Sequence, residues 1–307
     1  ITTRQSIQFH WVKLGGVPDL LRELAQEHVT TYHGCGDVNR NVAACPMAET
    51  CAHARFNVRP YAREAARVIA ASHDLDNLPR KFKTVWSGCP GRCAQPYMNC
   101  LGMTAVQCAV DGETRTGFQA VIGGGMGWKG FVAQEVFSFV PADRAVALAR
   151  AVALLFRDHG DRFNRSKARL KFVVHRYGVE RCREIILENL RNEGVSTDGL
   201  RHDPLPEAGQ PVPERPLTDS AVRTNDGSAV VRARIPMGEM TAAQLMGLVE
   251  ASERYADQRI YTTNRQNIEL HGVDPRKRPD AVEAVHRLGL PTDGVEGLRD
   301  IVPCVGT

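Results

Sequence analysis

The sequence predicts an α+β protein with a duplicated architecture, built from α/β sandwich halves and separate α+β domains. The main observation is a repeat, because TTRQSIQFHWV at 2–12 matches TNRQNIELHGV at 263–273 with an offset of 261 residues. Internal repeats of this kind indicate related halves. In both copies an alternating, strand-like segment precedes an amphipathic helix, at 17–28 and 278–289. A run with five prolines at 203–219 cannot hold a helix and predicts a linker between the halves.

The remaining elements follow from hydrophobic patterning along the chain. In the second copy a strand at 228–238 leads into a helix at 241–256, which completes a strand-helix-strand-helix unit. Between the copies the pattern predicts a separate α+β domain, with strands at 84–88, 103–110 and 117–122 and helices at 141–158 and 166–191.

Composition narrows the class of protein. A chain of 307 residues is long enough for two or more domains. The net charge of +4 is small, and no basic block exceeds RKFK at 80–83, which argues against a nucleic-acid partner. The sequence lacks a stretch of 18 apolar residues, so we expect no membrane partner. Nine cysteines cannot all pair, which favours a reducing, cytoplasmic setting.

Four cysteines form two short clusters, Cys45-x5-Cys51 and Cys89-x3-Cys93, separated by 37 residues. Four thiolates are the ligand set of a tetrahedral zinc ion or of a 4Fe-4S cluster. Structural zinc usually takes shorter hooks, so the five-residue gap favours iron. Cationic side chains flank both clusters and indicate an anionic substrate.

A second match extends the repeat and concerns the ends of the chain. NRNVAAC at 39–45 matches LRDIVPC at 298–304, which pairs Arg40 with Arg299 and Cys45 with Cys304. The chain opens inside a strand-like pattern and closes inside a motif. The sequence therefore predicts an internal fragment of a longer protein.

Several of these motifs together resemble the sirohaem-dependent sulfite and nitrite reductases over nearly the whole chain: TTRQSIQFH, GDVNRNV, LPRKFK and the cysteine quartet. The resemblance implies ferredoxin-like sandwich halves and sirohaem/4Fe-4S-binding domains. The domains it predicts are a truncated first ferredoxin-like half (1–28), a sirohaem/4Fe-4S-binding domain (29–165), a helical segment with the Pro-rich linker (166–219), a second ferredoxin-like half (220–295) and the start of a second, truncated sirohaem-binding domain (296–307).

The same resemblance implies the cofactors. A 4Fe-4S cluster would be held by the quartet, with Cys93 bridging to the iron of sirohaem. Reduction of sulfite or nitrite takes six electrons, and a cluster wired to the haem iron can refill it while substrate stays bound. A zinc knot or four unrelated buried thiols remain the alternative.

The candidate catalytic residues are Lys81, Lys83 and Arg40. Lys81 and Lys83 are two apart on a strand, so they should project to one face and form a cationic cup with Arg40. In the resembled family the matching residues bind substrate and supply protons. The alternative for RKFK is a solvated charge run.

Arg4 and Gln8 are the candidate cofactor-binding residues of the first copy, since the family places this strand against the macrocycle. Sirohaem carries eight carboxylates, which arginines suit. The pseudo-twofold repeat adds a sharper hypothesis for the other arginines. A sirohaem on the Cys45–Cys93 quartet would face Arg234 and Arg299 of the second half, whereas the first-half cations would face a site built on Cys304.

Sulfite reduction to sulfide is the preferred activity, because GDVNRNV and PRKFKT are closest to sulfite-type members. Nitrite reduction to ammonia follows, then the oxygenase branch that makes a cobalamin precursor on the same fold. A cluster-only electron carrier or a zinc-stabilised binding module represents a different class. The sequence shows no flavin or nicotinamide motif, so the electron donor would be ferredoxin or a flavoprotein subunit.

Overall fold

The computed structural model describes residues 1–110, 113–127, 129–204, 224–295, 297 and 300–303. The helices are α1 (Val17–Gln26), α2 (Arg59–Ala70), α3 (Ala145–His159), α4 (Leu170–Asn192), α5 (Ala242–Tyr255) and α6 (Arg278–Arg287). The strands are β1 (Ala43–Ala44), β2 (Thr84–Ser87), β3 (Leu101–Val110), β4 (Glu113–Ile122), β5 (Gln134–Pro141), β6 (Ala229–Ala233), β7 (Tyr261–Thr262) and β8 (Ile268–Val273).

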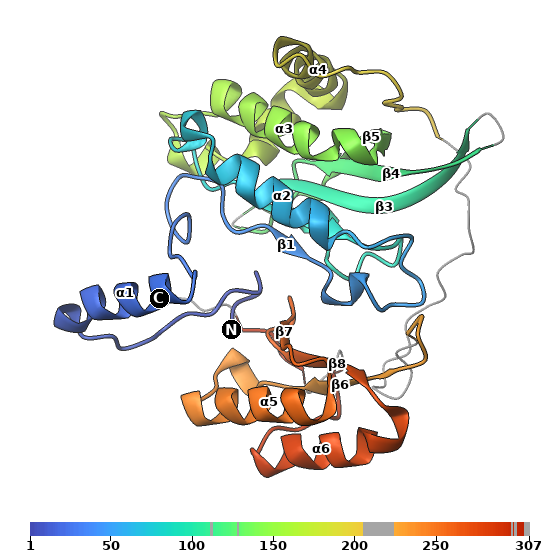
Figure 1. Ribbon diagram of the computed structural model, residues 1–307. Coiled ribbons are helices and arrows are strands. Elements are labelled where there is room, and N and C mark those ends of the chain that lie inside the picture. The colour runs from blue at the N-terminus through green and yellow to red at the C-terminus, as the bar shows by residue number, and fades with distance from the viewer. Residues whose placement is uncertain (111–112, 128, 205–223, 296, 298–299, 304–307) are drawn as a thin grey trace.

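The larger unit is a five-stranded mixed sheet with the strand order β1-β2-β3-β4-β5 (Figure 1). β1, β2 and β3 are parallel, with Ala43 opposite Val85, and the remaining pairs are antiparallel. Helices α2, α3 and α4 share one core with the sheet, in which Trp86 and Phe118 are fully buried and their rings meet edge to face at 5.0 Å. This core fixes the ends of β1 and β2, where the chemistry-bearing motifs lie.

The smaller unit is a three-stranded antiparallel sheet with the order β6-β8-β7, packed against α5 and α6 (Figure 1). Its core contains Val231, Leu248, Leu270 and Val285. A capping box starts α5, since the Thr241 side chain accepts from the N–H of Gln244 and Gln244 accepts in return from the N–H of Thr241.

The strand predicted at 2–12 is wrong, although the two copies of the repeat keep the same turn. The N–H of Thr2 donates to Ser6 O at 2.8 Å, and the N–H of Thr263 donates to Asn267 O at 2.9 Å. Beyond the turn the second copy becomes β8, held between β6 and β7. Residues 7–12 have no such strand pairing among the described residues, and a strand needs a hydrogen-bonded partner.

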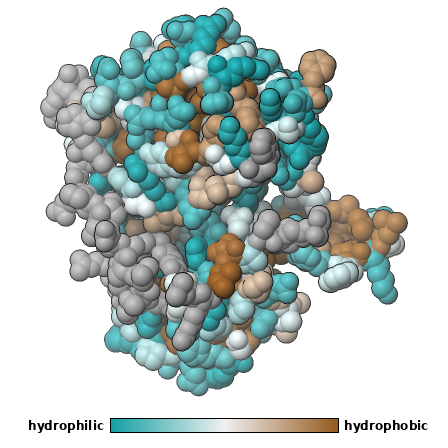
Figure 2. All heavy atoms as spheres, turned by 180° about the vertical axis from the view of Figure 1, so that it is seen from behind, coloured by the Kyte–Doolittle hydropathy of each residue, from teal (hydrophilic) through white to brown (hydrophobic). Residues whose placement is uncertain are grey.

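The segment from residue 7 to the end of α1 consequently exposes apolar side chains of the first copy to solvent (Figure 2). Phe9 is 58% exposed, whereas its repeat equivalent Leu270 is fully buried in the smaller sheet. Trp11 and Leu14 are 99% and 88% exposed. The duplicated architecture is therefore present only in part: the chain holds one five-stranded unit and one three-stranded unit, and not two copies of each.

Most predicted helices lie within a few residues of the observed ones, but α2 and β5 have no counterpart in the prediction. The predicted linker at 203–219 falls mostly outside the described residues, as do Arg299 and Cys304. In the part of the chain that the structure describes, no helix is long and apolar enough to cross a membrane.

Hydrogen bonds from the N-terminal segment join the two units. The ammonium group of Ile1 donates to Gly238 O at 2.6 Å. The Gln5 amide donates to Ala44 O at 2.7 Å on β1 and to Thr262 O at 3.2 Å on β7. The N-terminal turn therefore bridges β1, the edge strand of the larger sheet, and β7, the edge strand of the smaller sheet.

Candidate active site

The parallel pairing of β1 with β2 places the predicted site residues in two separate groups. Arg40 and Lys83 precede the strands, and the N–H of Arg40 donates to Phe82 O at 2.8 Å. Cys45 and Cys89 follow the strands, and the N–H of Cys45 donates to Trp86 O at 2.8 Å. Because an extended residue advances about 3.3 Å, five residues separate the groups by roughly 15 Å. The cations and the thiols lie at opposite ends of the same strands.

We call Cys45, Cys51, Cys89 and Cys93 the thiol centre. A 3-10 turn follows Cys45 and returns the chain, with the N–H of Cys51 donating to Met47 O at 2.8 Å. A second turn follows β2, where the N–H of Arg92 donates to Cys89 O at 3.1 Å. The two turns pack closely, because a Cβ on Gly88 would lie 3.2 Å from the Ala48 Cα.

The four thiols are electrostatic neighbours. A hydrogen bond with Cys93 is the main cause that lowers the pKa of Cys89, while burial and the charges of Cys45 and Cys51 act in the opposite direction. Cys45 and Cys89 are each only 5% exposed. Among the described residues no three His, Cys, Asp or Glu side chains form a single-ion cage. Four neighbouring, partly buried thiols fit the donor set of a 4Fe-4S cluster.

The smaller unit faces the thiol centre through a cavity of about 20 Å³, lined by Cys45 and Cys93 together with Arg232, Arg265 and Glu269. A cavity of that size holds about one water molecule. The smaller unit therefore packs closely against the thiol centre.

Buried charges surround this cavity on the side of the smaller unit. Arg232 on β6 pairs with Glu269 on β8 at 2.9 Å, and both side chains are less than 10% exposed. Glu269 also contacts the ring of His271 at 3.0 Å. Arg234, predicted to face the thiols, instead donates from Nε to Asp293 O at 3.2 Å and does not line the cavity. The arginines beside the thiols are Arg232 and Arg265.

We call the cations at the other end, Arg40, Lys81, Lys83 and Arg169, the cation basin. Phe82 is fully buried while Lys81 and Lys83 are partly exposed, so the two lysines share a face as predicted. Burial is the main cause that lowers the pKa of both lysines, followed by the charge of Arg169 for Lys81 and of Arg4 for Lys83. The pKa of Lys83 falls to about 8. Like charges thus converge here, as an anion site requires.

Sequence reasoning missed Arg169 and Lys171, which come from the start of α4. Arg169 Nη2 lies 3.3 Å from the Cys100 sulfur, and Lys171 is 3% exposed with its Nζ donating to Gly125 O at 3.3 Å. Both lie where the chain enters α4, and no local pattern in the sequence marks them as site residues.

The glycine run at 123–127 brings its backbone against the neighbouring chain beside these cations. A Cβ on Gly124 would lie 2.2 Å from Tyr97 O, and a Cβ on Gly123 would lie 2.9 Å from the Val174 side chain. Gly123 also has a φ of +83°, which L side chains rarely adopt. The run therefore provides close backbone packing.

Arg4 is half-buried beside the cation basin, whereas Gln8 is exposed. The Arg4 guanidinium donates to the Asn99 side chain at 2.8 Å, to Asn41 O at 2.6 Å and to Thr84 O at 2.8 Å. Burial is the main cause that lowers its pKa to about 10.

Two buried donors at the basin lack a partner, namely Nε of Arg4 and Nε of Arg169. Buried unpaired donors are costly, so an anionic group such as a carboxylate suits this place. By charge the basin fits sirohaem carboxylates. The four thiols, however, lie at the opposite end of β1 and β2, so the residues do not fit one sirohaem that would touch both groups.

Comparison with known proteins defines the class to which the fold and the two groups belong. Residues 35–193 match the model of the nitrite and sulphite reductase 4Fe-4S domain, and residues 222–288 match the nitrite/sulfite reductase ferredoxin-like half domain. The chain belongs to the nitrite and sulphite reductase family, with one copy of each domain.

Individual relatives are similar over most of this chain. The assimilatory ferredoxin-dependent nitrite reductase of Haloferax mediterranei is 32% identical over 87% of this chain and 46% of its own length. Sulfite reductase [ferredoxin] 2 of Mycolicibacterium paratuberculosis is 29% identical over 100% of this chain and 53% of its own. The solved structure of Mycobacterium tuberculosis NirA superposes with a TM-score of 0.82 at 26% identity, over 95% of this chain and 51% of NirA. The chain spans about half the length of the curated relatives it matches.

Proposed function

We propose that this chain is part of an oxidoreductase that reduces a small oxyanion by six electrons, with sulfite as the preferred substrate and nitrite as the alternative. The observation that carries the proposal is the convergence of Arg40, Lys81, Lys83 and Arg169 at one end of β2, in a family domain that carries four thiols at the other. The sulfite preference rests on GDVNRNV and PRKFKT, whereas the Haloferax relative named a nitrite reductase supports the alternative.

The basin residues have separable tasks. Arg40 donates from Nη1 to Gly34 O at 3.0 Å and from Nε to Gly36 O at 3.1 Å, which directs its guanidinium along its own loop. A fixed cation of this kind stabilises oxyanion charge without reorganisation. Lys83, with a pKa of about 8, stays mostly protonated at neutral pH but releases a proton more readily than an ordinary lysine.

The thiol centre would hold a 4Fe-4S cluster, with Cys93 as the residue that would link it to sirohaem, the second cofactor. Together they would supply electrons singly to a substrate that stays bound until six have arrived. Because the two groups lie at opposite ends of β1 and β2, we propose that they serve different anion sites. The thiol centre uses Arg232 and Arg265, and the basin serves a second centre for which Cys304 is the candidate ligand.

The predicted domain limits stand as part of the proposal: a ferredoxin-like half at 1–28, the cofactor-binding domain at 29–165, helix and linker at 166–219, a second ferredoxin-like half at 220–295 and a second cofactor-binding domain from 296. Ferredoxin is the proposed electron donor, since two relatives are named as ferredoxin-dependent reductases. A flavoprotein subunit is the alternative, because another relative is named as the haemoprotein component of an NADPH sulfite reductase.

The test is to purify the complete protein and to measure its absorption spectrum, its iron, labile sulfide and haem, and its turnover of sulfite and nitrite with reduced ferredoxin. We expect an isobacteriochlorin band and a kcat/KM that is higher for sulfite. Colourless protein with bound zinc would refute the proposal in favour of a binding module. Cluster absorption without haem or turnover would refute it in favour of an electron carrier.

Substitution of single arginines tests the two-site part of the proposal. We expect Arg40→Gln to weaken anion binding at the cation basin and Arg232→Gln to weaken it at the thiol centre. A single detectable haem whose turnover depends on Arg40 alone would show that the two-site assignment is wrong.

A further inference from the structure

One carboxylate ties together the three segments that carry the cation basin. Asp37 Oδ1 lies 3.2 Å from Arg80 Nη1, and Oδ2 lies 2.8 Å from Arg165 Nη1. The backbone of Asp37 adds a third connection, since its carbonyl accepts from the N–H of Leu78 at 2.8 Å. Asp37 itself lies three residues before Arg40. The residue therefore contacts the Arg40 loop, the lysine strand and the approach to α4.

Each of these contacts lies next to a basin cation. Arg80 directly precedes Lys81 in the chain. Holding Arg80 on Asp37 therefore fixes the backbone from which Lys81 projects into the basin. Arg165 lies in a short 3-10 turn four residues before Arg169.

Asp37 is held in its ionised form by the same arginines. Burial alone would raise the pKa of this half-buried carboxyl, but hydrogen bonds and charge from Arg165, and then from Arg80, lower the pKa below its usual value. The ion pairs of Asp37 with Arg80 and Arg165, which we call the ionic clasp, therefore persist across the neutral pH range.

We propose that Asp37 is a positioning residue that sets the spacing of the basin cations and so fits the basin to a small oxyanion. The inference rests on the proposed function for its substrate. It adds a residue that touches neither substrate nor cofactor and acts through Arg40, Lys81 and Arg169.

The sign of the effect distinguishes positioning from simple electrostatics. Replacing Asp37 by asparagine removes a negative charge near the basin, and charge alone would then strengthen anion binding. If Asp37 acts by positioning, the same substitution weakens anion binding, because the cations no longer converge.

The experiment uses the full-length, cofactor-loaded protein. For Asp37→Asn we expect the KM for sulfite and the calorimetric Kd for inorganic phosphate to rise about fivefold, as expected for the loss of a weak ionic clasp, with kcat changed less than twofold. Asp37→Glu should restore most of the affinity. Should Asp37→Asn fail to fold, Arg165→Gln gives the same test, since Arg165 is the more exposed partner at 65% against 31% for Arg80.

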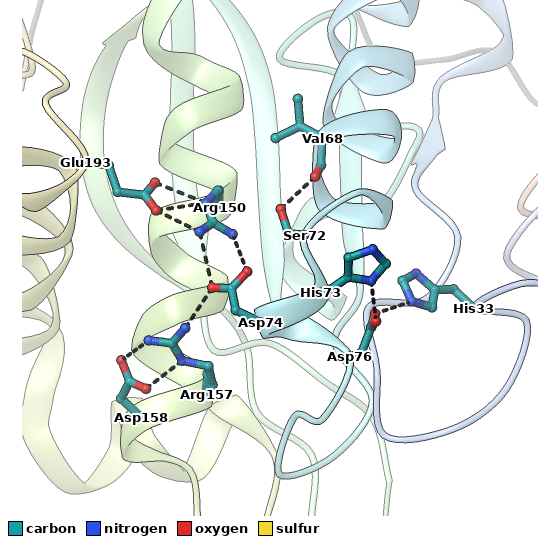
Figure 3. Close-up of polar contacts among 10 residues, drawn as sticks. All are labelled: His33, Val68, Ser72, His73, Asp74, Asp76, Arg150, Arg157, Asp158 and Glu193. Carbon is teal, nitrogen blue, oxygen red and sulfur yellow. Dashed lines mark hydrogen bonds and ion pairs between the residues drawn. The ribbon is translucent and has the colours of Figure 1, made fainter.

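Asp74→Asn is the matched control, because Asp74 also pairs with two arginines, Arg150 at 3.1 Å and Arg157 at 2.7 Å (Figure 3). These arginines lie on α3 and belong to no basin segment. The control should leave the KM for sulfite and the Kd for phosphate unchanged.

Two outcomes separate this inference from the proposed function. Phosphate binding that is unchanged or tighter in Asp37→Asn overturns the positioning role, as does an equal loss in Asp74→Asn. Wild-type protein that reduces neither sulfite nor nitrite overturns the proposed function. In that event a weaker phosphate affinity in Asp37→Asn alone would still support the positioning role.

Discussion

Replacement of Lys83 by methionine should stabilise the fold while removing activity. The pKa of Lys83 is lowered from 10.5 to about 8, chiefly by burial and then by the charges of Arg4 and Arg169. A difference of that size corresponds to about 3 kcal/mol at roughly 1.4 kcal/mol per pKa unit. Because Lys83 is only partly buried, screening reduces this to about 1 to 2 kcal/mol.

The dependence on pH gives the prediction its sign. Between pH 8 and pH 10.5 the unfolded state keeps the proton on Lys83 and the folded state has lost it, so wild-type stability rises with pH in this window. The advantage of Lys83→Met should therefore be full at pH 7 and fall to roughly a quarter by pH 10.

The assay is urea unfolding of the full-length protein in anion-poor buffer, with wild type and Lys83→Met compared at each pH. Turnover of sulfite is measured on the same samples. A variant that is less stable than wild type at pH 7, or whose advantage does not shrink by pH 10, would refute the assignment of Lys83 as a destabilised buried cation.

Three further predictions concern packing and thiol reactivity. Arg4→Ala should lower the free energy of unfolding by about 3 kcal/mol, because three acceptors lose a charged, partly buried donor. The denaturant midpoints of wild type and variant measure this loss. Gly124→Ala should cost at least about 2 kcal/mol because its Cβ would lie 2.2 Å from Tyr97 O; an unchanged melting temperature would contradict it. In metal-free protein Cys89 should be alkylated faster at pH 8 than Cys182, because burial raises the pKa of Cys182 to about 11 whereas the pKa of Cys89 is lowered. Peptide mapping of the alkylated protein compares the two rates.

Local pattern was enough to find the groups that carry chemistry. Alternation on one strand placed Phe82 in the core and Lys81 and Lys83 together on the other face. The cysteine spacing likewise identified the four thiols, which lie in two tight turns after β1 and β2. These features depend on a few consecutive residues, so the sequence contains them directly.

Features that depend on distant pairing were not predictable. The segment at 2–12 has a strand-like pattern, but within the described ranges of the chain no strands flank it as β6 and β7 flank β8 in the second copy. Arg234 has the alternation expected for the thiol face, yet β6 ends at Ala233, so Arg232 and not Arg234 reaches the thiol centre. Arg169 joins the basin only because α4 starts beside the glycine run, which no local pattern shows.

We propose that the thiol centre and the cation basin are separate sites at opposite ends of two parallel strands. The phosphate affinity of full-length Cys93→Ser protein, measured alongside its cluster absorption, tests this separation. We expect reduced cluster absorption with a phosphate Kd within about twofold of wild type, because roughly 15 Å separates the two groups. A phosphate affinity that falls in step with the cluster, in protein that melts like wild type, would contradict the claim.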